Sequence, residues 1–340
     1  MTDPTRQGIL AAGNFIIDHV KVIDEYPTPE MLATIVSQSR SNGGGPYNLL
    51  KDLAKLQAPF PLAALGLTGH DADGDWILAD CALSHIDASR LRQTSDAATS
   101  YTDAMTVQRG GQRTFFHHRG ANARLAPGHF DFSGSQARLF YLGYLMLLDG
   151  LDQFDGEGRT GASRVFERAR QHGCITCADL VSVNHPGFAS IVASSLPWID
   201  ILFINEIEAG KVLQRDLRSQ DPADARAMEA AAEDLIQLGS RETVVLHFGD
   251  GAVAANARQG VFRQGRVRLP VESIAGATGA GDAFAAGYLM AYHQGHSIPE
   301  CLELAVSAAA SSMTAGTPSD GLQPAPAALD FARSHGFLAL

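Results

Sequence analysis

A glycine-rich segment in the last quarter of the chain combines an anion-binding loop with a carboxylate. In GATGAGDAFAAGYLMAY (276–292), Gly276, Gly279 and Gly281 allow sharp backbone turns, and the residues from Asp282 onward predict a buried helix of small side chains. A loop that enters a helix in this way points several unpaired N–H groups at one spot. These groups and the helix dipole favour a phosphate oxygen or a developing negative charge.

The residue after the last glycine is an acid, where an ATP-binding P-loop has lysine. Gly276–Gly281 is followed by Asp282, so the segment does not match G-x-x-x-x-G-K-[ST]. A carboxylate here can take a proton from a hydroxyl that attacks phosphorus, while the amides of Gly279, Ala280 and Gly281 hold the charge on the transferred group. The alternative is that Asp282 is only the N-cap of the helix.

This segment resembles the second signature of the ribokinase (PfkB) family of carbohydrate and nucleoside kinases. The match is TGAGDAF at 278–284. The resemblance implies that Asp282 is the catalytic base, that the amides before it form the anion hole, and that Thr278 lies at the nucleotide. It also implies a ribokinase-like α/β fold: a three-layer α/β/α sandwich with a central, mostly parallel sheet and a small β-sheet lid.

Two segments near the N-terminus place polar groups at the ends of apolar elements. The pattern of residues 8–24 predicts a strand, a break and a second strand. In residues 41–57, a run of glycines leads into a predicted helix. They resemble the family patterns G-N-x-x-x-D and G-G-x-x-x-N, which bind sugar hydroxyls. The matching positions are Gly13, Asn14 and Asp18, then Gly43, Gly44 and Asn48. For Asp18 a solvated strand-end carboxylate is the alternative.

The segment NEIE (205–208) carries the metal prediction. Asn205 ends an apolar run, and Glu206 and Glu208 open a predicted helix. Amide and carboxylate oxygens suit Mg²⁺, usually through its waters. Asn205 and Glu208 match the family's N-x-x-E, which implies a site for Mg²⁺ and phosphate. Alternatively, both acids only stabilise the helix dipole.

The segment HFGDGAVAANA (247–257) predicts a glycine turn between two strands. It resembles the family's nucleotide-binding T-x-G turn, with His247 in place of threonine and with Gly249 and Gly251 retained. A second departure is Gly276, which stands where the family commonly has an acid that helps hold a monovalent cation. The resemblance therefore implies ATP and Mg²⁺ and makes potassium activation doubtful. Small residues at 305–312 suit either an approach to the nucleotide or tight helix packing.

Residues 99–120 predict a β-hairpin around RGGQ. Strands this polar on one face do not fit inside a parallel sheet, so they predict, with residues of about 14–40, a separate lid that excludes water from the phosphate. The triplet GAN at 120–122 fits the family as well. Arg113, His117, His118 and Arg119 face either substrate or solvent. An exposed hairpin edge allows two lids to pair into a homodimer.

The remaining elements predict the scaffold that positions these groups. Apolar runs alternate with helical stretches, which predicts right-handed βαβ units and a parallel sheet covered on both faces. The runs are 137–148, 174–182, 200–206 and 242–249, and the helices lie near 158–172, 186–196, 206–214 and 222–239. Ligands of such sheets bind beyond the carboxyl ends of the strands. No linker divides residues 1–340, so we expect one domain with an inserted lid.

The composition and charge of the chain argue against some classes of binding partner. The net charge is −11 without a dense Lys/Arg cluster, which argues against nucleic acid or an anionic membrane as partner. The sequence has no run of eighteen apolar residues, and its N-terminus lacks the pattern of a signal peptide, so we expect a cytoplasmic location. Cys174 and Cys177 lie in an apolar run and predict packed thiols rather than a redox or zinc site.

The sequence therefore predicts an ATP-dependent kinase for a hydroxyl of a small sugar. A nucleoside kinase similar to adenosine kinase is the alternative, because Phe15, Tyr47, Phe115 and Phe116 are able to stack a base. A phosphorylated sugar is left open by the two lid arginines. A non-catalytic sugar sensor on the same fold is a further alternative, given His247 and Gly276. A dinucleotide oxidoreductase is excluded by the lack of G-x-G-x-x-G after the first strand.

Overall fold

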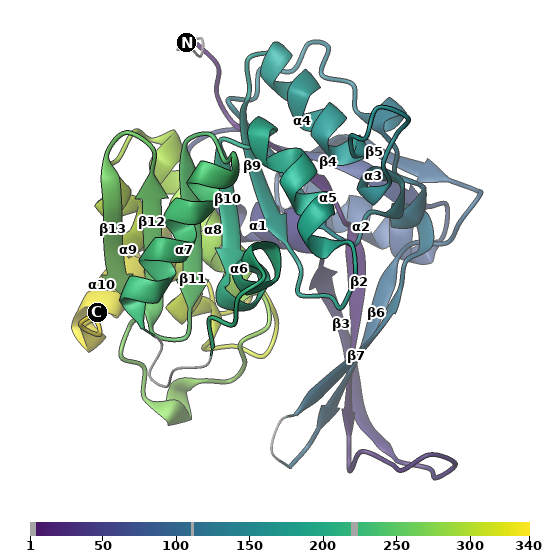
Figure 1. The fold of residues 1–340 in the computed structure, drawn as a ribbon. Coiled ribbons are helices and arrows are strands. Elements are labelled where there is room, and N and C mark those ends of the chain that lie inside the picture. Colours follow the sequence, from purple (N-terminus) through teal and green to yellow (C-terminus); the bar gives the residue numbers. More distant parts are fainter. Residues whose placement is uncertain (1–4, 110–111, 219–223) are drawn as a thin grey trace.

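Two β-sheets organise the chain, and a central sheet covered by helices on both faces carries most of it (Figure 1). The computed structural model describes residues 5–109, 112–218 and 224–340. Within these residues the central sheet has nine strands in the order β13-β12-β11-β10-β9-β8-β1-β4-β5. Neighbouring strands from β11 to β5 are parallel, whereas β12 and β13 are antiparallel to their neighbours.

The central strands are buried because helices cover both of their faces. All five residues of β1, for example, are buried apolar residues or glycine. This burial explains why the parallel strands read as continuous apolar runs in the sequence. The strands are β1 (Ile9–Gly13), β4 (Leu62–Gly69), β5 (Asp87–Thr94), β8 (Leu139–Leu145), β9 (Ile175–Leu180), β10 (Ile201–Asn205), β11 (Thr243–Phe248), β12 (Gly251–Asn256) and β13 (Gly260–Gly265).

The helices form two layers, and each layer has its own hydrophobic core. One core joins the sheet to α1 (Gly45–Lys55), α2 (Ala72–Leu83), α8 (Ala280–His293), α9 (Ile298–Ser312) and α10 (Ala325–His335). The other joins it to α3 (Asp149–Asp152), α4 (Gly161–Gln171), α5 (Phe188–Ser195), α6 (Glu206–Leu213) and α7 (Ala225–Leu238). The expected three-layer α/β/α sandwich is thus confirmed.

The second sheet projects from one end of the central sheet (Figure 1). It consists of β2 (Ile16–Ile23), β3 (Ile35–Gly43), β6 (Tyr101–Val107) and β7 (Arg113–His118), in the order β3-β2-β6-β7. β2 and β6 are parallel, and the other pairs are antiparallel. We call this sheet the lid. The predicted hairpin is present as β6 and β7, while Gly110 and Gly111 of its turn lie outside the described residues.

The predicted apolar runs are strands, and the structure adds details that the sequence did not predict. The edge strands β5 and β13 were missed, and β3 reaches Gly43, beyond the expected lid boundary of about residue 40. The helix expected near 222–239 is Ala225–Leu238, and its first expected residues, 222–223, lie outside the described part. Cys174 and Cys177 are buried free thiols, as expected. Among the described helices, none is long and apolar enough to span a membrane.

Candidate active site

Asp282 lies in the first turn of α8, where it meets side chains from α1 and β8. It is only 3% exposed, and it accepts a hydrogen bond from Asn48 Nδ2 at 2.8 Å. Tyr144 Oη donates to Asp282 Oδ1 at 2.6 Å and to Oδ2 at 2.7 Å. Burial raises the pKa of Asp282 to about 6, although both donors act in the opposite direction. An acid with this pKa is ionised at neutral pH and is suited to general-base catalysis.

The loop before Asp282 turns into the helix at a glycine. Gly279 is the N-cap, with φ of 80°, and a Cβ atom there would lie 2.6 Å from Pro318 Cβ. Asp282 is therefore not the N-cap, and the capping alternative does not hold. The Ala280 amide donates to the Ala277 carbonyl at 3.2 Å. Of the three predicted anion-hole amides, those of Gly279 and Gly281 have no acceptor among the described residues.

Asp18 faces Asp282 from the lid. A Cβ atom on Gly43 would lie 2.4 Å from Asp18 Oδ1, so a glycine on the neighbouring strand makes room for this carboxyl. Burial, and then the charge of Asp282, raise the pKa of Asp18 to about 7, while Thr102 and Arg113 lower it. The structure thus brings two carboxylates to one space between the lid and the central sheet.

The other predicted sugar-binding residues divide into two groups. Asn48 connects Asn42 Nδ2 (2.7 Å to Asn48 Oδ1) with Asp282, so its amide belongs to the site. Asn14 is fully buried; its Oδ1 accepts from the Tyr144 amide at 2.5 Å, and its Nδ2 donates to the Leu147 carbonyl at 3.2 Å. Asn14 therefore holds the end of β8 instead of facing the sugar space.

Gly44 supports this arrangement through its backbone. It is the N-cap of α1 with φ of 87°, and a Cβ atom there would lie 2.1 Å from the Asn14 carbonyl oxygen. The helix start therefore packs directly on the end of β1, which brings Asn48 to Asp282.

Four basic side chains of the lid were left open between substrate and solvent. Arg113 crosses to residues 276–281, which we call the transfer loop. Its Nη1 donates to the Thr278 hydroxyl, and its Nη2 donates to the Gly316 carbonyl at 3.3 Å. His117 Nδ1 lies 3.0 Å from the Thr102 hydroxyl, on the Asp18 side of the lid, and its buried Nε2 has no partner among the described residues. Burial is the main cause that lowers the pKa of His117 to about 4, so the imidazole ring is neutral.

The other two basic side chains point elsewhere. His118 stacks on Tyr101 with ring centroids 5.0 Å apart, and Arg119 forms an ion pair with Asp149. Arg113 and His117 are thus the two members of this group that adjoin the site.

Asn205 and Glu208 form a capping box at the start of α6. The Glu208 amide donates to Asn205 Oδ1 at 2.9 Å, and the Asn205 amide donates to Glu208 Oε2 at 3.0 Å. Ser182 Oγ donates to Glu208 Oε1 at 2.8 Å. Burial raises the pKa of Glu208, and these hydrogen bonds oppose the shift. No cluster of three or more His, Cys, Asp or Glu in the described parts of the chain could hold a metal directly.

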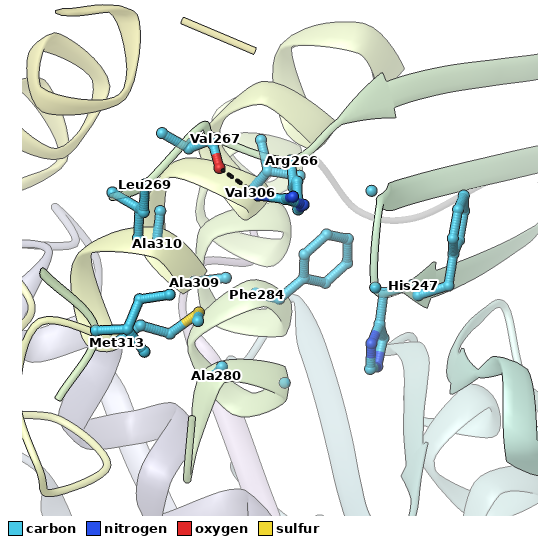
Figure 2. Close-up of a pocket in the computed structure, with 15 residues that line it drawn as sticks. His247, Arg266, Val267, Leu269, Ala280, Phe284, Val306, Ala309, Ala310 and Met313 are labelled. Carbon is cyan, nitrogen blue, oxygen red and sulfur yellow. Dashed lines mark hydrogen bonds between the residues drawn. The ribbon is translucent and has the colours of Figure 1, made fainter. Parts of the chain in front are cut away.

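A cavity of about 260 Å³ begins beside the transfer loop (Figure 2). The predicted turn residues line one side, and Phe284 of α8 lies in its wall, with its ring 5.4 Å from that of His247. Burial lowers the pKa of His247 to about 4, so its imidazole is uncharged. The turn residues are His247, Gly249 and Gly251.

The small residues of α9 fall into two groups, one that lines the cavity and one that packs against α8. Ala309 and Ala310 line the cavity, whereas Ala305 and Ala308 pack against α8 at Gly287, where a Cβ atom would lie 3.0 Å from Ala308 Cβ. The cavity thus has an apolar wall of small side chains that suits a flat ring.

One residue of the site was missed by the sequence reasoning. Tyr144 lies within a run that predicted only a buried strand, yet its hydroxyl bonds the central carboxylate. The available signal was a tyrosine after a glycine at the carboxyl end of that strand. Phe15 and Tyr47, by contrast, were considered for base stacking, but both are fully buried and pack on each other with centroids 5.7 Å apart.

A glycine loop that caps a helix, a buried acid behind it and a lid opposite define an enzyme of the phosphoryl-transfer class on an α/β scaffold. The chain belongs to the pfkB family of carbohydrate kinases, whose model matches residues 6–325. Members of this family are phosphotransferases.

The two relatives and the solved structure described below are also kinases, in agreement with the family match. The chain is 24% identical over 325 residues to the ATP-dependent ribose-1-phosphate kinase of Halopiger xanaduensis, covering 94% of this chain and 95% of the relative. It is 30% identical over 116 residues to adenosine kinase of Dictyostelium discoideum, a match that spans only 34% of either chain. The structure of Arabidopsis thaliana ribokinase complexed with ribose and ATP superposes with a TM-score of 0.75 at 20% identity, covering 96% of this chain and 99% of that one.

Proposed function

We propose that this protein is an ATP-dependent kinase that transfers the γ-phosphate of ATP to a hydroxyl of a small sugar. The observation that carries the proposal is the position of Asp282: a buried carboxylate with a pKa of about 6, directly after a loop whose Gly279 and Gly281 amides have no acceptor in the part of the chain that the structure describes. A base and an anion hole in this proximity are what attack by a hydroxyl on phosphorus requires.

The proposed reaction uses the chain's own groups at each step. Asp18 and Asn48 hold the sugar so that one hydroxyl faces Asp282. Asp282 accepts the proton of that hydroxyl, the sugar oxygen bonds to the γ-phosphorus, and the bond to the β,γ-bridging oxygen breaks to release ADP. The amides of Gly279, Ala280 and Gly281 are assigned to the charge on the transferred group; that of Ala280 must exchange its 3.2 Å bond to Ala277.

The nucleotide is assigned to the cavity beside the loop. Its base would lie against Phe284 and the alanines of α9, with the phosphates directed toward Thr278. Gly43 and Gly44 shape the sugar side by leaving space for Asp18 and for the close approach of α1. His247, Gly249 and Gly251 would contact the nucleotide at the turn.

Mg²⁺ fits this site through water rather than by direct protein ligation. Both Glu208 oxygens already accept hydrogen bonds from protein groups, and each retains capacity for a metal-bound water. Asn205 and Glu208 are therefore the residues that would hold Mg²⁺. When bound, the ion neutralises charge on the β- and γ-phosphates.

A sugar is favoured over a nucleoside by the composition of the lid side of the site. Asp18, Asn48 and the unpartnered His117 Nε2 provide hydrogen-bonding groups for several hydroxyls. Two of the four aromatic residues considered for base stacking are packed in the core. Arg113 keeps a phosphorylated sugar among the substrates to be tested.

A coupled assay of ADP release, with a panel of sugars, sugar phosphates and nucleosides, tests the proposal and identifies the substrate. We expect Asp282→Asn to lower kcat about 10²–10⁴-fold with ATP binding unchanged, and to melt at a temperature no lower than that of the wild type. Asp330→Asn, which changes an exposed aspartate on α10, is the control and should retain full activity. Near-normal turnover of Asp282→Asn would refute the assignment of the base. ATP-independent sugar binding without ADP release would favour the sensor.

A further inference from the structure

Tyr144 is fixed from several sides at the carboxyl end of β8. Its backbone amide donates to Asn14 Oδ1 at 2.5 Å, and its ring packs on the start of α1, where a Cβ atom on Gly45 would lie 2.9 Å from Tyr144 Cε1. This packing leaves the hydroxyl directed at Asp282.

The tyrosine hydroxyl has one proton, and it shares this proton between both oxygens of Asp282, at 2.6 and 2.7 Å. Asp282 Oδ2 accepts a second hydrogen bond from Asn48. The carboxylate is therefore oriented by two donors from two different elements. A substrate hydroxyl that gives its proton to Asp282 needs one of the oxygens that Tyr144 now contacts.

We propose that Tyr144 is the positioning residue of the base: it orients Asp282 and moves onto Oδ2 when the substrate hydroxyl takes Oδ1. This inference rests on the proposed kinase function. Oδ1 is assigned to the substrate because Oδ2 is held by Asn48. The sugar proton passes to Oδ1, and Tyr144 keeps its own proton throughout, since burial and the charge of Asp282 raise its pKa well above that of a free tyrosine.

The electrostatic surroundings give the tyrosine a second effect. Asp18 of the lid, Asp52 of α1 and Asp179 of β9 all interact with the charge of Asp282, and the Tyr141 hydroxyl donates to Asp179 at 3.1 Å. Burial disfavours the ionised base, whereas the hydrogen bonds from Tyr144 and Asn48 favour it, and the charge of Asp282 in turn raises the pKa of each of the three acids. Removal of the hydroxyl should therefore raise the pKa of Asp282.

Tyr144→Phe tests this inference through the pH dependence of kcat/KM. We expect the acidic limb to move up by about one pH unit, because the lost hydrogen bond stabilises the ionised carboxylate, and the rate to approach that of the wild type at high pH. Tyr288→Phe is the control, since its buried hydroxyl on α8 has no partner among the described residues. An equal loss of rate at every pH would show a purely structural role and overturn the inference.

A titration of the Asp282 carboxyl by ¹³C NMR, assigned with Asp282→Asn, gives a readout that does not depend on activity. An upward pKa shift in Tyr144→Phe and none in Tyr288→Phe would support the pairing even if no kinase substrate were found. An active kinase whose limb and carboxyl titration are both unchanged by Tyr144→Phe would overturn this inference and leave the proposed function intact.

Discussion

Asp18 and Asp282 repel each other across the space that the substrate would enter. Both carboxyls have raised pKa values, and each lies among few compensating cations. Such pairs lower the stability of the folded state at neutral pH, because the unfolded chain ionises them more readily. The active site is therefore a place where removal of a charge should stabilise the protein while it weakens function.

Asp18→Asn should stabilise the protein at alkaline pH. The pKa of Asp18 is about 7 in the folded state against 3.8 for the free side chain, so its contribution to stability is fully present below pH 3.8 and is lost as pH rises through 7. We expect a gain on the order of 1–3 kcal/mol at pH 8, measured by urea unfolding, which shrinks as the pH falls toward 4.

The same variant should raise KM for the sugar, because it removes an acceptor for sugar hydroxyls. If Asp18→Asn had a lower free energy of unfolding than the wild type at pH 8, ionisation of Asp18 would not destabilise the folded state. The proposed repulsion between the two carboxylates would then be wrong.

Gly276 leads to a prediction about monovalent cations. A Cβ atom at this position would lie 3.0 Å from Arg113 Nη2, so the arginine occupies the space into which an acidic side chain would extend. A guanidinium already supplies positive charge there, bonded to Thr278 and to the Gly316 carbonyl. We expect the rate to stay the same when potassium is replaced by tetramethylammonium at constant ionic strength. A several-fold rise in rate with added potassium would contradict this.

At the scale of elements, the start of α6 forms a capping box from the two residues that are proposed to hold Mg²⁺. A matched capping box begins α9, where the Ser297 amide donates to Glu300 Oε2 at 2.8 Å, and neither of these residues lines the cavity assigned to ATP. Glutamine can replace glutamate in a capping box without loss of the capping hydrogen bond. The same substitution in the two boxes therefore separates the structural role of a capping glutamate from a role in binding metal.

Glu208→Gln should raise the Mg²⁺ concentration for half-maximal activity several-fold, since it removes a charge that would orient metal-bound water. Glu300→Gln should leave that concentration unchanged, and both variants should lose less than about 1 kcal/mol of stability. Activity as a function of Mg²⁺ at fixed ATP measures the effect. Equal Mg²⁺ requirements in the two variants would limit Glu208 to capping.

The sequence predicted those elements whose signal is local. Runs of apolar residues predicted the buried strands, and glycines before an amphipathic run predicted the start of α1. The edge strand β5 has the sequence DASRLRQT, without a run of apolar residues, because much of this strand is exposed to solvent. Tyr144 was missed for a different reason: the carboxylate that it contacts lies 138 positions away in the chain, and nothing local marks that contact.

At the scale of the whole molecule, we propose that residues 1–340 form one domain from which the lid projects as an insertion. Arg113 joins the lid strand β7 to Thr278 in the transfer loop, two segments 165 positions apart. The contact ties the lid to the loop proposed for phosphoryl transfer, and it places a positive charge beside that loop in a chain whose net charge is −11.

The lid, together with the connection between β2 and β3, carries most of the exposed large apolar side chains among the described residues. Leu32 is 85% exposed in the connection between β2 and β3, Val36 is 50% exposed on β3, and Phe116 is 51% exposed on β7. Both edge strands, β3 and β7, have an unpaired side. Exposed edges with apolar residues favour pairing with another chain, and a second copy of this lid is the simplest partner.

We therefore predict a homodimer that forms through the lid, to be measured by light scattering coupled to size-exclusion chromatography over a concentration series. Leu32→Lys combined with Phe116→Lys should shift the protein to the monomer, because two buried charges at each interface oppose association. Leu83→Lys is the control: this leucine is 81% exposed at the end of α2, outside the lid, and its replacement should leave the dimer intact. A wild-type protein that stays monomeric at every concentration, or a dimer that survives the double substitution, would exclude the lid as the interface.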